Sequence, residues 1–591
     1  MENIKIAYSE PEDYFPEDIR KKFFGKKDFF DFDDTEKCEA LAKLLFPDVT
    51  ETPEQCLERF PKREFKEGAK VTRFAPSPTG FLHFGGLFPT TVGERLAHQS
   101  GGVFILRIED TDAKREVEGA AEKLIVTLDH YGIKFDEGAT VDGEKGIYGP
   151  YYQSKRGPIY HVFAKQLVRE GKAYPCFTSD EELEKMNAVD KKAEIKEKDW
   201  HFDAEAAREQ MLDQRRFTLD DVKNSLEKGD KFVLRIKSNG DANIKRKFTD
   251  LIKGTIDVPE NDEDFVLLKS DGIPTYHFAH AVDDRLMGTT HVIRGEEWLP
   301  SLPKHLQLFA YLGFKAPKYM HIAQIMRLDE NGAKKKLSKR DMGANMEDYR
   351  RMGYAPDCVM EYVMTLLNSN YEEWHMQNPD KKYTDFPFDI KKMSTSGCLF
   401  DFAKLNDVSK NVLSRYSADR IYDGVTEWAQ DYDSDFAGLL TRDPEYTKRV
   451  FAIGRVGKKP RKDFGTWGEC KGYMGFFFDE LFSVTDGFPE GKSTEDAKKM
   501  LIDFAEQFNI CDDQTAWFDK IKAIADKYGY ATDMKAYKAT PEAFKGSVAD
   551  VSSFMRLAVT GRLNSPDMYE VMQILGYDRV VNRINSFAKA L

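Results

Sequence analysis

One stretch decides the fold: Val71-Thr-Arg-Phe-Ala-Pro-Ser-Pro-Thr-Gly-Phe-Leu-His-Phe-Gly-Gly86. Its first five residues predict a short buried strand, the prolines and Gly80 predict an irregular turn, and a helix is expected from Gly86 to Gln99. Glycines let backbone N–H groups approach a phosphate, and a helix presents its positive dipole end to an anion. The stretch therefore predicts a nucleotide site in which His83 donates to a phosphoryl oxygen. The alternative without a binding function is a strand-to-helix turn with a packed histidine.

A second strand follows in the same pattern. The apolar run Val103–Ile108 predicts a strand that ends in the acidic run Glu109-Asp-Thr-Asp112, and helical spacing returns between Glu118 and Tyr131. Strands that alternate with helices predict an α/β fold with a parallel sheet. Ligands of such sheets gather beyond the carboxyl ends of the strands, where both motifs lie.

The rest of the chain divides by pattern. Residues 1–70 predict a small N-terminal extension of unknown role, a folded cap in preference to a flexible arm, with a helix at Glu36–Phe46. Charged helices from Asp180 to Arg216 and a strand at Lys231–Ile236 predict an inserted domain. Strands of the main sheet are expected again at Val266–Lys269 and Thr290–Arg294. The predicted boundaries are 1–70, 71–150 for the first half of the sheet domain, 151–265 for the insertion, 266–345 for the second half, and 346–425 and 426–591 for two helical regions.

Composition limits the class of protein. The 591 residues carry a formal net charge of −13, which argues against a general nucleic-acid coat protein but leaves room for local basic surface. The seven cysteines form no C-x-x-C pair, so we expect no zinc site and a reducing compartment. Neither a membrane span nor a signal peptide is evident, which predicts a soluble, cytoplasmic protein with no membrane partner.

A second motif is basic: Lys335-Lys-Leu-Ser-Lys-Arg340. A mobile basic loop of this kind can neutralise the charge that builds on phosphates as pyrophosphate leaves, and Lys336 and Lys339 are the candidates. Taken alone, the run is better explained as a solvated loop. Its place about 250 residues after the first motif and behind a predicted strand favours the catalytic interpretation.

These motifs together resemble the class I glutamyl-tRNA synthetases. The first matches the nucleotide motif of that family, with Gly86 in place of a final histidine, as is normal for the glutamate branch. The resemblance continues through Leu106–Asp112 and Gly149–Arg156, is strong over about 71–345, and is fair to about 420. It implies a Rossmann-like parallel-sheet catalytic domain, an inserted acceptor-binding domain and a mainly α-helical C-terminal half with stem-contact and anticodon-binding regions.

The resemblance also implies roles for individual residues. Arg73 and Arg294 would hold the carboxylates of glutamate, because a guanidinium pairs with a carboxylate through two hydrogen bonds. Glu109 would take the α-ammonium group, and Ser77, Tyr276 and His280 would add contacts, His280 being a departure from the asparagine of many relatives. His83, Lys336 and Lys339 would be catalytic. The implied ATP contacts are Pro76, Thr79, Gly80, His83, Gly85, Gly86, Glu297, Trp298, Ile325, Met326, Lys336, Ser338 and Lys339.

A basic segment near the start of the last region suggests a surface for RNA. The run Gly454-Arg-Val-Gly-Lys-Lys-Pro-Arg-Lys-Asp463 is followed by Trp467, and basic groups beside aromatic rings suit phosphate contact and base stacking. A solvated loop is an equal alternative. The candidate tRNA-binding residues are Arg455, Lys458, Lys459, Arg461 and Lys462.

The resulting hypothesis is ATP-dependent ligation of L-glutamate to the terminal adenosine of tRNA(Glu) through a glutamyl-adenylate. ATP would be a substrate with Mg²⁺ held by its phosphates, without a dedicated metal site, and a monomer is expected. A non-discriminating enzyme that also glutamylates tRNA(Gln) remains open. Less favoured are a glutaminyl-tRNA synthetase, a shortened enzyme that glutamylates a modified tRNA base, and a catalytically dead tRNA-binding protein.

Overall fold

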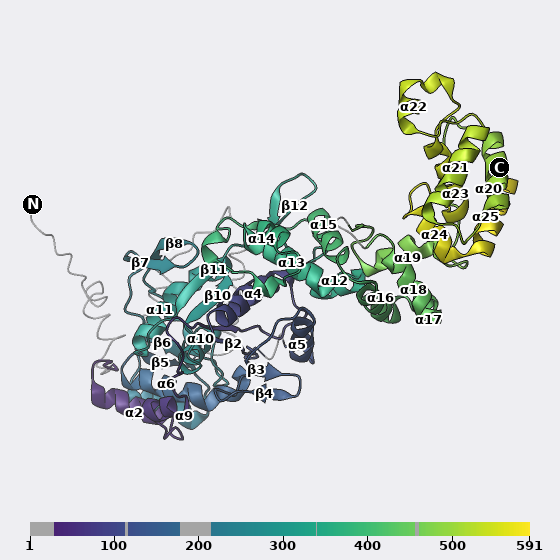
Figure 1. The fold of residues 1–591 in the computed structure, drawn as a ribbon. Helices are drawn as coiled ribbons and strands as arrows, with labels where there is room; N and C mark the ends of the chain where they lie inside the picture. Colours follow the sequence, from purple (N-terminus) through teal and green to yellow (C-terminus); the bar gives the residue numbers. More distant parts are fainter. Residues whose placement is uncertain (1–28, 113–115, 178–213, 339, 456–459) are drawn as a thin grey trace, which may run out of the picture. The chain divides into compact units, whose positions relative to one another are not determined.

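The computed structural model describes residues 29–112, 116–177, 214–338, 340–455 and 460–591, which form two compact units (Figure 1). The first unit holds the described residues up to Ile325 together with Thr384–Cys398. The second holds Met326–Tyr383 and Leu399–Leu591. Lys339, Lys458, Lys459 and most of the predicted helical segment 180–216 lie outside the described residues.

The first unit is built on the predicted parallel sheet. Strands β1 (Val71–Phe74), β2 (Val103–Leu106) and β3 (Glu137–Thr140) pair in parallel, and β4 (Gly143–Lys145) adds an antiparallel edge. Helix α4 (Phe84–Gln99) connects β1 to β2, and α5 (Ala120–His130) connects β2 to β3. Both helices and both leading strands were expected within about two residues of these bounds, so the α/β prediction is confirmed.

A second parallel pair extends this layer. Strands β10 (His291–Gly295) and β11 (Lys318–Ile322) pair in parallel and are joined by the short helix η3 (Glu296–Ser301) and α11 (Leu302–Tyr311). The N–H of Thr290 donates to the carbonyl of Val71 at 2.9 Å, which places β10 beside β1. The carboxyl ends of β1, β2 and β10 therefore lie at one edge.

The inserted region forms a smaller antiparallel layer. It contains η2 (Gln153–Arg156), α6 (Gly157–Arg169), α9 (Leu219–Lys228) and a sheet of β5 (Ala173–Cys176), β6 (Val233–Ile236) and β9 (Val266–Leu268). The strand expected at Val266–Lys269 thus exists, but it pairs with β6 and not with the parallel sheet. In the chain, a hairpin of β7 (Lys245–Asp250) and β8 (Gly254–Pro259) comes before β9, and α10 (Tyr276–Leu286) comes after β9.

The described part of the N-terminal extension is folded. Helices α2 (Thr35–Leu45) and α3 (Pro53–Arg59) contact α6, and their apolar side chains, such as Leu41 and Cys56, enter the core of the first unit. Arg63 then forms two hydrogen bonds with the carboxylate of Glu137, at 2.8 and 2.7 Å, and a third with the carbonyl of Met287 at 2.8 Å. Residues 29–70 therefore form a folded cap that packs on the sheet domain, which was preferred over a flexible arm.

The second unit is mainly helical, and a large apolar cluster with members from Ala355 to Ala588 packs many of its helices. A small sheet consists of β12 (Ile325–Leu328), β13 (Lys334–Lys336) and β14 (Cys398–Leu399), and all of its residues except Ile325 and Cys398 belong to this unit. Among the described helices, none combines the length and apolar character needed to cross a membrane. The α-helices are Met346–Met352, Pro356–Leu367, Tyr371–Gln377, Phe402–Leu413, Ala418–Tyr432, Ser434–Arg442, Pro444–Ala452, Trp467–Met474, Thr494–Gln507, Gln514–Lys527, Met534–Ala539, Val548–Thr560, Met568–Leu575 and Tyr577–Ala590 (α12 to α25).

Candidate active site

The turn after β1 brings the His83 ring to the start of α4. His83 caps this helix, and its Nδ1 accepts a hydrogen bond from the backbone N–H of Gly85 at 2.8 Å. Because Nδ1 accepts, a neutral ring carries its proton on Nε2, which is the nitrogen able to donate. A Cβ added at Gly85 would lie 2.9 Å from His83 Nδ1, so glycine is required for this contact. The arrangement places the His83 ring at a helix N-terminus, the part of a helix that suits a phosphate.

The rest of this turn links the ends of β1 and β2. The carbonyl of Pro76 accepts the N–H of Glu109 at 2.9 Å, which fixes the two strand ends together. Ser77 is exposed, Thr79 is half-buried, and Gly80 has a φ of 139°, a conformation that disfavours any side chain. The turn is therefore held at its base and accessible at its tip.

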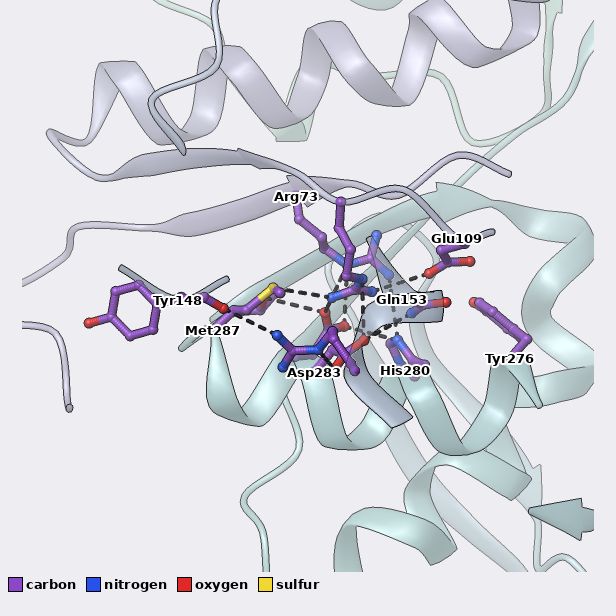
Figure 2. A network of polar contacts seen from close by, with 12 residues as sticks. Arg73, Glu109, Tyr148, Gln153, Tyr276, His280, Asp283 and Met287 are labelled. Atoms are coloured by element: carbon purple, nitrogen blue, oxygen red, sulfur yellow. Dashed lines mark hydrogen bonds and ion pairs between the residues drawn. The ribbon is translucent and has the colours of Figure 1, made fainter. Parts of the chain in front are cut away.

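A group of buried charges lies beneath these strand ends (Figure 2). Asp284 accepts from Arg73 Nε at 3.2 Å and from Arg107 Nη1 at 2.7 Å, and Arg107 Nη2 donates to Glu109 at 3.2 Å. Burial acts to raise the pKa of Asp284, but the two arginines outweigh it and hold that pKa well below its usual range. For Glu109 burial wins and its pKa is raised, so an ammonium group beside it would stabilise the carboxylate.

The carboxylate of the neighbouring Asp283 also accepts several hydrogen bonds from buried side chains. Its carboxylate accepts from Arg156 Nε at 2.7 Å, Gln153 Nε2 at 2.9 Å and the hydroxyl of Tyr160 at 2.7 Å. The sequence reasoning assigned no role to Asp283, Asp284 or Arg107. The sequence feature that could have indicated these residues is a charged side chain within an apolar pattern. Arg107 interrupts a run of buried strand residues, and the two aspartates lie on a buried helix face.

Arg294, at the end of β10, has different partners. Its Nε donates to His321 Nε2 at 3.0 Å, and its Nη1 donates to His305 Nδ1 at 3.0 Å and to the Tyr276 hydroxyl at 3.3 Å. Its Cζ lies 4.9 Å from the centre of the Tyr319 ring. Its Nη2 is buried and has no hydrogen-bond partner among the described residues. This donor points to a missing acceptor, which a substrate carboxylate could supply.

His280 connects the two arginine environments. Its Nδ1 lies 2.9 Å from Asp284 Oδ2, and its Nε2 lies 2.8 Å from the Tyr319 hydroxyl. A carboxylate only accepts, so Nδ1 carries the proton and Nε2 accepts from Tyr319. Burial lowers the pKa of His280 to about 4, although Asp284 acts to raise it. Both ring nitrogens are engaged within the protein, which leaves neither for the direct glutamate contact expected from the sequence.

The expected walls of the ATP pocket lie next to this group. The Tyr276 and Trp298 rings are 4.6 Å apart, and Trp298 is 39% exposed. Glu297 is exposed beside it, and Ile325 is buried at the start of β12. Glu297 and Trp298 follow β10 directly in η3, so their position in space comes from the same strand end that carries Arg294.

The basic motif lies in the second unit, at the hairpin of β12 and β13. Met326 pairs with Lys336, and the Lys336 side chain is exposed. The N–H and the hydroxyl of Ser338 donate to Asp341 Oδ2 at 2.7 and 2.8 Å, which fixes the chain just after Lys336. Lys339 lies outside the described residues. The loop thus keeps an exposed ammonium group on an anchored hairpin.

The candidate tRNA residues differ in how they are held. Arg455 donates to the carbonyls of Phe451 and Leu413, at 2.6 and 2.8 Å, and Arg461 pairs with Asp463 at 2.6 Å. Lys462 is exposed, whereas Trp467 is buried in the helical core and is not available for base stacking. Lys458 and Lys459 are not among the described residues.

A cavity of about 560 Å³, which no sequence motif predicted, lies between α21, α23 and α24. Arg556, whose Nε donates to Ser565 Oγ at 3.0 Å, and the buried Trp517 line it. Trp517 Nε1 has no hydrogen-bond partner in the described part of the chain. The partly exposed ring of Phe518 lines the same cavity as the Arg556 guanidinium, and an aromatic ring and a guanidinium together suit an unpaired base. The other lining residues are Gln514, Thr515, Phe518, Asp519, Ile521, Lys522, Ser552, Met555, Asp567 and Met568.

Across the described ranges, no group of three or more His, Cys, Asp and Glu side chains is placed to hold a metal ion.

Comparison with known proteins gives consistent matches. The family model for the catalytic domain of class I tRNA synthetases (E and Q) matches residues 70–407, and that for an anticodon-binding domain matches residues 460–588. The glutamate–tRNA ligase of Acetivibrio thermocellus is 48% identical over 548 residues, covering 92% of this chain and 98% of the relative. That of Clostridium perfringens strain SM101 is 47% identical over 555 residues, covering 93% and 99%. The crystal structure of glutamate-tRNA synthetase from Elizabethkingia anophelis matches with a TM-score of 0.69 at 26% identity, covering 88% of this chain and all of that one.

Proposed function

The chain belongs to the glutamate–tRNA ligases, a family of class I aminoacyl-tRNA synthetases, and on that premise we propose how its own residues ligate glutamate to tRNA. The observation that carries the proposal is the unpartnered, buried Nη2 of Arg294. A guanidinium with a free donor, set at the carboxyl end of a central strand, is a site for a carboxylate. We assign it the side-chain carboxylate of glutamate.

The remaining contacts to glutamate follow from their positions. Arg73 lies one residue before the end of β1 and near Glu109, so one can face the α-carboxylate and the other the α-ammonium group. Tyr276 and the exposed Ser77 supply neutral hydrogen bonds. His280 acts through Asp284, whose orientation it fixes, and not by direct contact.

Adenylate formation is assigned to the turn after β1 and to the basic hairpin. An oxygen of the α-carboxylate attacks the α-phosphorus of ATP, the bond to the bridging oxygen breaks, and pyrophosphate leaves with its Mg²⁺. His83 Nε2 and the N-terminus of α4 face the phosphates, while Lys336 and Lys339 neutralise charge on the leaving group. The nucleotide contacts are Pro76, Thr79, Gly80, Gly85, Gly86, Glu297, Trp298, Ile325, Met326 and Ser338.

Transfer then uses the terminal adenosine of tRNA. Its ribose hydroxyl attacks the carbonyl carbon of the adenylate, AMP leaves, and the hydroxyl proton passes to the phosphate or to solvent. We assign the acceptor stem to residues 151–265, stem contact to 346–425 and the anticodon to 426–591, with the cavity beside Arg556 receiving an unpaired base. Lys458, Lys459 and Lys462 would meet phosphates, and Arg455 and Arg461 would shape that loop. The enzyme would act as a monomer in the cytoplasm, where its three substrates meet.

One experiment tests the reaction and its acceptor together. Purified tRNA(Glu) and tRNA(Gln) are each incubated with the protein, ATP and either labelled glutamate or labelled glutamine. Glutamate on tRNA(Glu), with AMP and pyrophosphate released in equal amounts, is the expected result. Glutamate on tRNA(Gln) at a similar rate would instead establish a non-discriminating enzyme. Glutamine on tRNA(Gln) as the main product would overturn the proposal.

A further inference from the structure

Four buried arginines meet at the proposed glutamate site, and one of them lacks a charged partner. Arg73 and Arg107 pair with Asp284, at 3.2 and 2.7 Å, and Arg156 pairs with Asp283 at 2.7 Å. Arg294 is only 5% exposed, yet it forms no ion pair with any carboxylate among the described residues. A buried, uncompensated charge is expensive, so its neutral surroundings require an explanation.

The first neutral partner of Arg294 is His321. Arginine only donates hydrogen bonds, so His321 Nε2 must accept from Arg294 Nε and cannot carry a proton. The ring proton is then on Nδ1, which lies 2.7 Å from Asp250 Oδ2, and the backbone N–H of His321 also donates to that carboxylate at 3.1 Å. Asp250 therefore fixes both the tautomer and the orientation of His321. A protonated His321 would direct an N–H at the Arg294 N–H.

The second neutral partner is His305. By the same reasoning its Nδ1 accepts from Arg294 Nη1, so its proton is on Nε2. That N–H faces His277 Nδ1 at 3.0 Å, which must accept. The two histidines thus form an ordered chain in which each ring is neutral. Burial lowers the pKa of His305 well below its usual range and that of His277 to about 3, which is consistent with this order.

We propose that His305 and His321 are positioning residues that determine specificity for the glutamate carboxylate. They hold Arg294 only by accepting hydrogen bonds, so they orient the guanidinium without neutralising it. Its charge and its free Nη2 are left for the substrate. A carboxylate supplies both an acceptor and the missing negative charge, whereas the amide of glutamine supplies an acceptor and a donor but no charge. This inference rests on the assignment of Arg294 to the side chain of glutamate.

The two histidines use different ring nitrogens, which gives a matched set of variants. The Oδ1 of asparagine is as many bonds from Cβ as Nδ1 of histidine, and the amide end of glutamine reaches the place of Nε2. At position 305, His305→Asn keeps the acceptor for Arg294, and His305→Gln keeps only the link to His277. At position 321 the pattern reverses, because His321→Gln keeps the acceptor and His321→Asn keeps only the donor to Asp250.

The experiment measures aminoacylation by all four variants, with the KM for glutamate, the KM for ATP and the ratio of kcat/KM for glutamate over glutamine. His305→Gln and His321→Asn should raise the KM for glutamate about tenfold or more, since a hydrogen bond of a charged group is displaced. They should lower the glutamate preference and leave the KM for ATP unchanged. His305→Asn and His321→Gln should remain within about threefold of the parent on every measure.

Two outcomes would overturn the inference: equal effects of asparagine and glutamine at both positions, or equal changes in the KM values for glutamate and ATP. Both variants at one position remove one buried hydrogen bond, so we expect them to lose similar stability. Thermal unfolding of each variant therefore shows whether a loss of activity comes from a loss of folding. Arg294→Ala tests separately the assignment on which this inference rests, namely that Arg294 binds the side-chain carboxylate of glutamate. If that variant keeps the parental KM for glutamate, the glutamate site itself is misplaced.

Discussion

The two sides of the proposed glutamate site bury arginines in opposite ways. On the side of β1 and β2, Arg73 and Arg107 share the carboxylate of Asp284, so the protein compensates its own charges. On the side of β10, Arg294 is surrounded by the neutral rings of His305 and His321. A compensated charge is already balanced within the fold, even where its guanidinium also meets a ligand, whereas an uncompensated one leaves its full charge for the ligand. Substitutions on the first side should therefore affect stability most, and those on the second should affect recognition.

The largest effect is expected from Asp284→Asn. This change leaves Arg73 buried without its carboxylate and removes the shortest ion pair of Arg107, which keeps Glu109 at 3.2 Å. Removing one partner of such a group costs about 3–5 kcal/mol of unfolding free energy. Urea unfolding measures it. The matched control is Asp257→Asn, which breaks an exposed ion pair with Lys247 and should cost less than about 1 kcal/mol. Similar losses in both variants would mean that Asp284 is not the hub of the network.

Arg294→Ala should show the reverse behaviour. It removes a charge that no carboxylate compensates, so the unfolding free energy should fall by less than in Asp284→Asn. The KM for glutamate should rise about 10- to 100-fold, because a charged hydrogen bond to the substrate is worth about 1.5–3 kcal/mol. Steady-state aminoacylation with glutamate and ATP varied in turn gives both constants. Equal increases in the two KM values would argue against a glutamate clamp.

Acid should weaken the first side through His280. Its pKa is about 4 in the fold, below the ordinary value of 6.5, because burial opposes its charged form. Between these two values the unfolded chain binds more protons at this site than the folded protein does. Its contribution to stability is therefore fully present above about pH 6.5 and is lost as the pH falls toward 4.

Urea unfolding at several pH values tests this with His280→Asn beside the parent. The variant lacks the titrating ring, so its unfolding free energy should fall less steeply over that window. Parallel pH profiles would show that His280 does not titrate as described.

The smallest effect is expected from Tyr319→Phe, which separates the two sides. The Tyr319 hydroxyl donates to His280, while its ring lies beneath Arg294. Phenylalanine keeps the ring and removes the hydroxyl, so the unfolding free energy should fall by about 1 kcal/mol. The KM for glutamate should stay within about twofold. A large rise in that KM would mean that the hydroxyl, and not the ring, supports Arg294.

The sequence predicted those elements whose signal is local. The strand at Val71–Phe74, the turn and the helix at Phe84–Gln99 were recognised because apolar runs, prolines and glycines restrict the backbone directly. The strand at Val266–Leu268 was recognised too, but its pairing with β6 was not. Its pairing depends on a segment about 30 residues earlier in the chain, and an apolar run carries no information about which strand it will join.

The sequence by itself determined the family, and it predicted the nucleotide turn and the residue types proposed to face glutamate, because these depend on short motifs of fixed spacing. Only the tertiary structure decided which charges are compensated. Arg73 and Arg294 look alike in the sequence, and each ends a strand. Asp284 reaches the first from a helix about 210 residues away, while His305 and His321 reach the second from α11 and β11. The charge state of a buried site depends on which groups the fold brings into contact, and that contact is non-local.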